Sequence, residues 1–145
     1  MINPTGGNIR NDKGGMGYFG ASRKKMLSNK LTRYRHRGVD YVCIPGQQVW
    51  MPFTGVILRY KNPYEGYSGI LFRGKGIIGT LFYVACEDLV INKEFQEGAV
   101  VGIAEDISQK YNDVTPHVHF QIDKIDPELL INIYKSLRGG GSANP

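Results

Sequence analysis

The chain has three histidines, and all of them fall in two short segments that are separated by most of the chain. His36 stands in HRGVD, whereas His117 and His119 stand in HVHF. Alternate side chains of a β-strand point to the same face, so His117 and His119 project together if HVHF is extended. A fold that uses the three imidazoles jointly must therefore return the end of the chain to the neighbourhood of residues 36–40.

Asp40 adds a carboxylate four residues after His36, and Gly38 lets the backbone bend between them. Two imidazole nitrogens and one carboxylate oxygen form a three-ligand zinc set whose fourth position is left to water, the pattern of catalytic zinc sites. The alternative to a metal site is that His117 and His119 are simply two surface histidines on a strand. With His117 and His119 there are four candidates for three positions, and the spacing alone does not say which one is left out.

The rest of the sequence predicts a β-rich domain. Nineteen glycines and seven prolines in 145 residues indicate many turns, and 41% hydrophobic residues suffice for a core. Short apolar segments separated by Pro and Gly follow residue 39, and IIGTLFYVACEDLVI is predicted to be one buried strand. The fold class we expect is mostly β, an antiparallel sheet with one C-terminal helix. The segment KKMLSNKLTRYRH is predicted to be a short helix or irregular.

One helix is predicted over residues 126–138. Asp126 is a good N-cap, Pro127 suits the first helical position, and Glu128 suits the positive end of the helix dipole. An apolar stripe is formed by Leu129, Leu130, Ile133 and Leu137. The chain then divides into an ordered N-terminal arm, a β domain that includes the helix, and a flexible tail, at residues 1–22, 23–138 and 139–145.

The net charge of +5 suits an anionic partner such as nucleic acid, a membrane surface or an anionic cell-wall polymer. Basic residues concentrate in one segment: Arg23, Lys24, Lys25, Lys30, Arg33, Arg35 and Arg37. This segment has no motif that recognises a groove of DNA or RNA, so nucleic acid is not the expected partner. The alternative is that the segment is a basic loop that contacts only solvent. Cys43 and Cys86 are two free thiols or one disulfide, which the sequence leaves open.

No apolar segment approaches the ~20 residues that span a bilayer. The first fifteen residues also lack the apolar region of a secretory signal. We therefore expect that the protein stays where it is made, is exported by another route, or lost its signal from this sequence. Delivery by a phage tail or related injection device is one such route.

An HxxxD motif followed by a distant HxH resembles the lysostaphin/LytM-type zinc endopeptidases. The resemblance runs through most of residues 17–122, and PGQQVWMPFTGVI, EGAVVGIAED and PHVHFQI match characteristic segments of that family. A narrower resemblance, carried by GMGYFGASR, HRGVDYVC, MPFTGVI, NPY, LFYV and HVHF, is to the chemotaxin 2-like branch of the same fold.

The resemblance implies a role for each site residue. His36, Asp40 and His119 would ligate Zn²⁺, and His117 would act on the zinc-bound water as general base or stabilise the tetrahedral intermediate. The active peptidases carry one more histidine, on the strand that here reads GTLFYVACE and has none. Tyr83 lies close to that place, where it would serve as a hydrogen-bond donor or only pack the core.

Two functional hypotheses follow from these implied roles. The first is a zinc endopeptidase that cleaves the peptide cross-links of peptidoglycan, in an extracellular, cell-wall or virion-associated setting. The second is a zinc-stabilised binding or structural module with a weak or inactive site, docked in a larger assembly. The missing histidine and the chemotaxin-like segments favour the second, and the complete ligand set with His117 favours the first.

Overall fold

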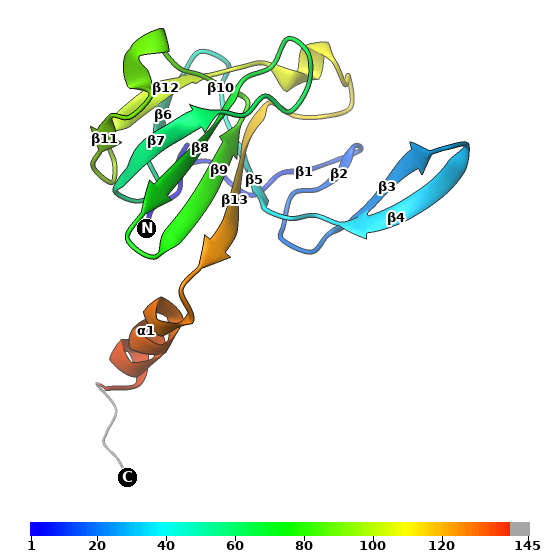
Figure 1. Ribbon diagram of the computed structural model, residues 1–145. Coiled ribbons are helices and arrows are strands. Elements are labelled where there is room, and N and C mark those ends of the chain that lie inside the picture. The colour runs from blue at the N-terminus through cyan, green and yellow to red at the C-terminus, as the bar shows by residue number, and fades with distance from the viewer. Residues whose placement is uncertain (140–145) are drawn as a thin grey trace.

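The computed structural model describes residues 1–139, and a six-stranded antiparallel sheet forms its centre (Figure 1). The strand order in this sheet is β11-β7-β8-β9-β13-β5, and a second antiparallel sheet has the order β10-β12-β6. The strands of the large sheet are β5 (Val39–Val42), β7 (Gly55–Tyr60), β8 (Gly69–Gly74), β9 (Ile77–Phe82), β11 (Glu94–Phe95) and β13 (His117–Ile125). Those of the smaller sheet are β6 (Gln48–Trp50), β10 (Val84–Ala85) and β12 (Val100–Ala104).

The remaining elements are two small ribbons, two 3-10 turns and a helix. The ribbons pair β1 (Asn11–Asp12) with β2 (Gly15–Met16) and β3 (Ser22–Leu27) with β4 (Lys30–Arg35). The turns are η1 (Asp88–Val90) and η2 (Ile107–Gln109), and the helix is α1 (Pro127–Gly139). The predicted fold class, a mostly antiparallel β domain with one C-terminal helix, is thus what the described residues show.

Strand β13 divides its residues between the core and the site. Val118 and Phe120 are buried in the main hydrophobic cluster, which takes members from both sheets. His117 and His119 alternate with them, as predicted, and are buried on the opposite face. Burial of Val118 and Phe120 therefore fixes the direction of the two imidazoles. If β13 presented its other face to the core, these two apolar side chains would be exposed.

The prediction of a short helix or irregular structure for KKMLSNKLTRYRH is wrong. The segment forms the β3–β4 hairpin, with Ser22 opposite Arg35 and Leu27 opposite Lys30. Ser28 and Asn29 connect the strands with φ of 50° and 62°, the left-handed pair that suits a tight hairpin turn. Neither face of the hairpin is buried, so the sequence has no apolar alternation by which the strands could be recognised.

The prediction of one continuous strand over IIGTLFYVACEDLVI is also wrong. Strand β9 ends at Phe82, Tyr83 has a φ of 67°, and the chain continues as β10 in the other sheet before η1. The backbone of Tyr83 is held by two hydrogen bonds, from its own N–H to the Ser68 carbonyl and from the Glu105 N–H to its carbonyl. A left-handed aromatic residue is unusual and is maintained only by such surrounding structure.

Helix α1 begins as predicted, because the Glu128 N–H donates to Asp126 Oδ1 at 3.0 Å. No side chain of α1 is buried, and only Leu129 packs partly against the core. The predicted apolar stripe is otherwise exposed, because α1 points away from the sheets (Figure 1). Of the predicted tail, Gly139 closes the helix and the rest lies outside the described residues. Among residues 1–139, no helix is long and apolar enough to cross a membrane.

The two cysteines are free thiols. Cys43 is buried at the end of β5, and Cys86 is half-buried after β10. Burial raises the pKa of each thiol to about 11. Both therefore stay protonated at neutral pH and are poor nucleophiles, so neither takes part in the site described below.

The turn of the β3–β4 hairpin generates a prediction. Asn29→Val places a β-branched residue in the left-handed region, at a cost of about 1–2 kcal/mol, whereas Asn29→Gly keeps the turn. Amide hydrogen exchange across β3 and β4 should accelerate in the valine variant alone, while the amides of Phe72 and Leu81 in the core keep their protection. Equal exchange in both variants would contradict the turn assignment.

Candidate metal centre

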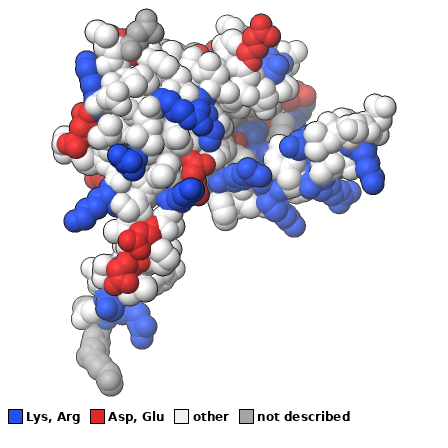
Figure 2. All heavy atoms as spheres, viewed as in Figure 1, with Lys and Arg blue, Asp and Glu red and all other residues white. Residues whose placement is uncertain are grey.

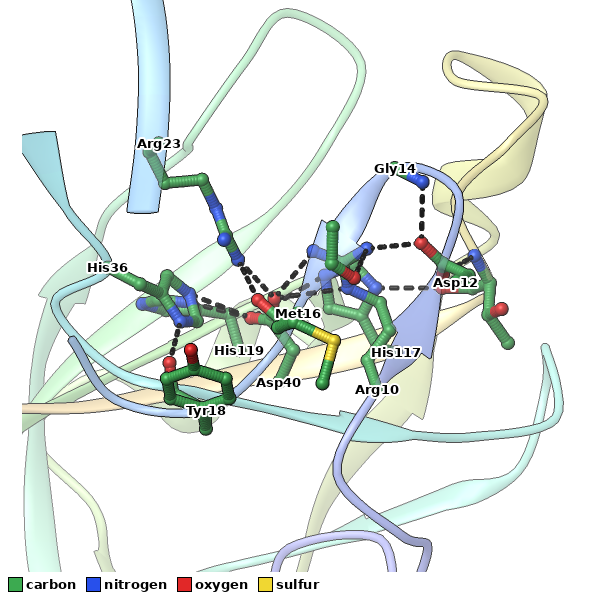
Figure 3. Close-up of polar contacts among 12 residues, drawn as sticks. Arg10, Asp12, Gly14, Met16, Tyr18, Arg23, His36, Asp40, His117 and His119 are labelled. Atoms are coloured by element: carbon green, nitrogen blue, oxygen red, sulfur yellow. Dashed lines mark hydrogen bonds and ion pairs between the residues drawn. The ribbon is translucent and has the colours of Figure 1, made fainter. Parts of the chain in front are cut away.

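The two histidine motifs meet because β5 and β13 are neighbours. Asp40 and His119 are direct partners across these strands, and His36 is placed by the loop that leads into β5. Ligand atoms of His36, Asp40 and His119 all lie within 4.8 Å of one another, and the three residues are buried. Figure 3 shows the side chains grouped around the Asp40 carboxylate, with His117 beside them.

One oxygen of Asp40 is the centre of this group. Asp40 Oδ1 lies 2.9 Å from His119 Nδ1, 3.2 Å from His36 Nε2 and 3.6 Å from His117 Nε2. His36 Nε2 and His119 Nδ1 are themselves 3.0 Å apart. Three imidazole nitrogens and one carboxylate oxygen thus lie close together, and both kinds of atom can serve as metal ligands.

The other ring nitrogen of each histidine has a hydrogen-bond acceptor. His36 Nδ1 donates to the Tyr18 carbonyl at 3.0 Å, and His117 Nδ1 donates to the Thr115 carbonyl at 2.8 Å. His119 Nε2 donates to Gln121 Oε1 at 2.8 Å. When a cation takes the nitrogens that face Asp40, these acceptors would hold a proton on each outer nitrogen, as in metal-ligating histidines.

The donor set fits zinc. Zinc accepts imidazole nitrogen and carboxylate oxygen, and catalytic sites use three protein ligands with one open position. The structure brings His36, Asp40 and His119 together as the three closest donors and leaves His117 slightly farther from Asp40. This grouping is the same set of three that the family resemblance implied.

The second oxygen of Asp40 is held by arginines, a feature that the sequence analysis missed. Arg10 Nε and Nη2 each lie 3.2 Å from Asp40 Oδ2, and Arg23 Nη2 lies 3.5 Å from it (Figure 3). Arg10 is 4% exposed. These contacts reserve Oδ2 for the guanidinium groups and leave Oδ1 for the histidine side, so the carboxylate is oriented before any cation binds.

Asp12 completes the anchor of Arg10. Arg10 Nη1 donates to Asp12 Oδ1 at 2.7 Å, and the Thr115 N–H donates to Asp12 Oδ2 at 2.7 Å. Thr115 is also the residue whose carbonyl holds His117. The arm thus connects both histidine segments. The sequence does not predict these contacts, because Arg10 and Asp12 stand in a Gly- and Asn-rich segment without a motif.

Electrostatics keeps the central carboxylate charged and one histidine neutral. Burial alone would raise the pKa of Asp40, but hydrogen bonds from His119 and His36 outweigh it, and the pKa falls well below its usual range. Burial lowers the pKa of His117, despite the opposing attraction of the Asp40 charge. The site at neutral pH therefore holds a carboxylate and a neutral His117 imidazole that can accept a proton.

Tyr83 lies beside the histidines. Its ring centroid is 5.1 Å from that of His117, in an edge-to-face arrangement, and it also contacts Tyr64 and Tyr67. Burial raises the pKa of its phenol, which stays protonated. Tyr83 is thus largely buried, and it also borders the cavity beside His117.

An open cavity of about 580 Å³ lies over this group. His117, His119 and Tyr83 line it, together with side chains from the β3–β4 hairpin and from the loops around Tyr64 and Tyr111. A cavity of this size admits a peptide-sized group to the histidines.

Gly38 has a different role from the one that the sequence indicated. Its φ is not in the left-handed region, so conformational freedom is not what the position requires. A Cβ atom here would lie 2.4 Å from the Phe120 carbonyl oxygen and 2.8 Å from His119 Nε2. Glycine is needed because β13 approaches the backbone closely, and this approach brings His36 and His119 together.

Sequence comparison shows similarity between the chain and animal proteins. It is 29% identical to leukocyte cell-derived chemotaxin-2 of Mus musculus over 121 residues, which cover 80% of this chain and 74% of that protein. No protein-family model matches the chain. The narrower resemblance drawn from the short motifs is thereby confirmed.

Structural comparison connects the chain to bacterial peptidases by fold. LytU matches over 88% of this chain and 86% of its own, with 17% identity and a TM-score of 0.60. A zinc-containing peptidase from Vibrio cholerae matches over 82% of this chain and 35% of its own, with 16% identity and a TM-score of 0.56. The catalytic domain of lysostaphin from Staphylococcus simulans matches over 63% and 69%, with 19% identity and a TM-score of 0.50. The lysostaphin/LytM-type fold predicted from the sequence is confirmed.

The buried ion pairs of Arg10 with Asp12 and Asp40 predict that Arg10→Leu destabilises the fold. This change leaves Asp40 Oδ2 and Asp12 without their main buried partner, and removing one member of such a pair costs roughly 3–5 kcal/mol. The free energy of unfolding, measured in urea, should fall by that amount. Arg59→Leu, at an exposed arginine of β7, is the matched control and should change it by about 0.5 kcal/mol or less. Equal losses would contradict a special role for Arg10.

The close approach at Gly38 predicts that Gly38→Ala disturbs the cation site. Strands β5 and β13 must separate to admit the methyl group, at a cost of about 1–3 kcal/mol, and His119 moves with β13. Isothermal titration with Zn²⁺ should show weaker binding than in the parent chain. Gly139→Ala, where nothing lies within 4 Å of the added Cβ, is the control and should bind as the parent does.

Proposed function

We propose that the chain is a zinc-dependent endopeptidase domain that cleaves the peptide cross-links of peptidoglycan. The observation that carries this proposal is the convergence of His36 Nε2, Asp40 Oδ1 and His119 Nδ1 at the floor of an open cavity. The fold shared with LytU and with a zinc-containing peptidase supports it. When bound, Zn²⁺ would supply Lewis-acid chemistry, lowering the pKa of a water molecule and polarising the substrate carbonyl.

His117 is the proposed general base. Its Nδ1 proton is committed to the Thr115 carbonyl, so Nε2 carries the lone pair and faces the Asp40 side of the cavity. Burial lowers the pKa of His117, which keeps this nitrogen unprotonated at neutral pH. It can therefore take a proton from the attacking water and return it to the leaving amine.

Tyr83 is the proposed hydrogen-bond donor to the oxyanion. Its raised pKa keeps the phenol protonated, and its ring borders the cavity next to His117. The segment GTLFYVACE, which contains Tyr83, has no histidine, so the phenol would replace the donor that the active peptidases place there. Losing one such donor costs about 10²–10³ in turnover, which sets the size of the expected effect.

The cavity rim suits an anionic peptide. Arg23, Lys24 and Arg37 lie on the hairpin side of the cavity. Peptidoglycan peptides carry free carboxylates, which these cations would attract. The proposed substrate places the chain in an extracellular or cell-wall setting.

The second candidate is a zinc-stabilised binding module, docked in a larger assembly. The specific observation in its favour is the similarity to leukocyte cell-derived chemotaxin-2 together with the absence of a histidine from the Tyr83 segment. In this case the cation would hold β5 to β13 and stabilise the fold without turnover. Zinc binding is common to both candidates, so only an activity assay separates them.

The test measures zinc and cleavage on the same samples. Elemental analysis should find one zinc per chain in the parent protein and in His117→Ala, and none in His119→Ala. Purified peptidoglycan should release new amino groups with the parent protein and not with His117→Ala. Tyr83→Phe should lower the rate by about 10²–10³, whereas Tyr134→Phe, on the exposed helix α1, should leave it unchanged.

Each deviation in that experiment has a defined meaning. Stoichiometric zinc without cleavage by the parent protein rejects the endopeptidase and leaves the binding module. Cleavage that is unaffected by Tyr83→Phe removes Tyr83 from the mechanism but retains His117. Absence of zinc from a zinc-replete parent protein contradicts both candidates.

A further inference from the structure

The β3–β4 hairpin is a projecting element with two open faces (Figure 1). Its strands pair with each other and, within residues 1–139, with no other strand. A two-stranded hairpin is marginally stable in water unless something packs on it. Beyond Arg23, Lys24 and Tyr34, which line the cavity near its base, the hairpin presents mostly exposed side chains on both faces.

The stem of the hairpin is strongly basic. Residues 22–37 contain seven Lys and Arg side chains and no Asp or Glu. Cross-strand partners share a face, so the pair Lys24–Arg33 lies on one face and Lys25 lies on the other. Figure 2 shows basic side chains along the hairpin and no acidic ones on the side in view. The positive charge therefore surrounds the stem.

The tip of the hairpin is apolar. Met26, Leu27 and Leu31 flank the turn and are 62%, 51% and 55% exposed. Met26 and Leu31 are direct partners on one face, and Leu27 lies on the other. In Figure 2 the end of the hairpin is mostly white, with basic side chains along its lower edge. Lys30, opposite Leu27, is the basic residue nearest the turn. Three large apolar side chains are thus presented to water in the last two residue pairs before the turn, beside Lys30.

We propose that this hairpin docks on a bilayer that contains anionic phospholipid. Met26, Leu27 and Leu31 enter the boundary between headgroups and acyl chains. The exposed basic side chains of the stem, such as Lys24 and Arg33, contact lipid phosphates. Elements that lie in a membrane interface combine an apolar part with a Lys- and Arg-rich part in this way. Each basic residue near an anionic leaflet adds to the attraction. The proposal is independent of the proposed peptidase activity.

The apolar tip distinguishes a bilayer from a soluble polyanion. A polyanion is bound by charge, and exposed Met and Leu add nothing to such a contact. Tyr34, the second-to-last residue of β4, supports the interfacial placement, because Lys25 Nζ lies 5.3 Å from its ring centroid and tyrosine favours the headgroup region. The charge and the apolar tip together thus indicate lipid.

Docking in this manner also orients the cation site. Arg23 and Tyr34, near the base of the hairpin, line the same cavity as His36 and His119. A hairpin anchored by its tip would therefore hold the cavity at the membrane surface rather than in bulk solvent.

Vesicle co-sedimentation tests the proposal with the whole chain. The parent protein should sediment with vesicles of phosphatidylglycerol and phosphatidylcholine, but not with phosphatidylcholine alone. Lys24→Glu with Arg33→Glu should weaken binding at least about tenfold. Met26→Ser with Leu31→Ser should also weaken it, roughly tenfold. Leu31→Trp should bind and show a blue shift of its emission, relative to the parent spectrum, only with the anionic vesicles.

Matched controls test whether the effect is specific to the hairpin or follows from any loss of positive charge or apolar surface. Lys75→Glu with Lys93→Glu removes the same charge elsewhere, and Leu130→Ser with Ile133→Ser removes the apolar face of α1; both should bind as the parent does. Hydrogen exchange across β3 and β4 should show that the serine variant keeps the hairpin. No binding to anionic vesicles overturns the proposal. The proposal is also overturned if the serine variant binds vesicles as well as the parent does and soluble polyphosphate competes for this binding. That outcome would identify a site for polyanions.

Discussion

The two oxygens of the Asp40 carboxylate face different partners, and the arrangement of the site depends on this division. Oδ1 faces three imidazole nitrogens, and Oδ2 faces two guanidinium groups. A buried carboxylate is tolerated only when its charge is compensated, and here the compensation comes from both sides. The histidines and Arg10 therefore need the same anion, although they come from opposite ends of the chain. A cation on the Oδ1 side would share this anion rather than compete for it.

The N-terminal arm is for this reason part of the site and not an appendage. Arg10 and Asp12 hold the carboxylate from one direction, and the Tyr18 carbonyl fixes the tautomer of His36 from another. Tyr83 approaches from the junction between the two sheets, where its left-handed backbone redirects the chain. Three regions without a shared sequence motif thus surround the histidines. The chemistry proposed for His117 and Tyr83 relies on the orientation that these regions impose.

The sequence predicted those features that rest on local pattern. The alternation in HVHF placed Val118 in the core and the histidines opposite it, and Asp126 marked the start of the helix. The β3–β4 hairpin was missed because strands without a buried face have no apolar period. The break at Tyr83 was missed because tertiary hydrogen bonds, not a glycine, impose its backbone conformation. Arg10 could not be predicted because its partner is thirty residues away in the chain.

The pairing of β5 with β13 has a consequence for how such a chain can diverge. His119 faces Asp40 by backbone register, and the next residue on either side of His119 belongs to the core. A single residue gained or lost within either strand would exchange imidazole for Val or Phe at the carboxylate and bury a histidine among apolar groups. The segments that join the strands are under no such restriction. Descendants of this sequence can therefore lengthen or replace their connections freely, while the count of residues inside these two strands stays fixed.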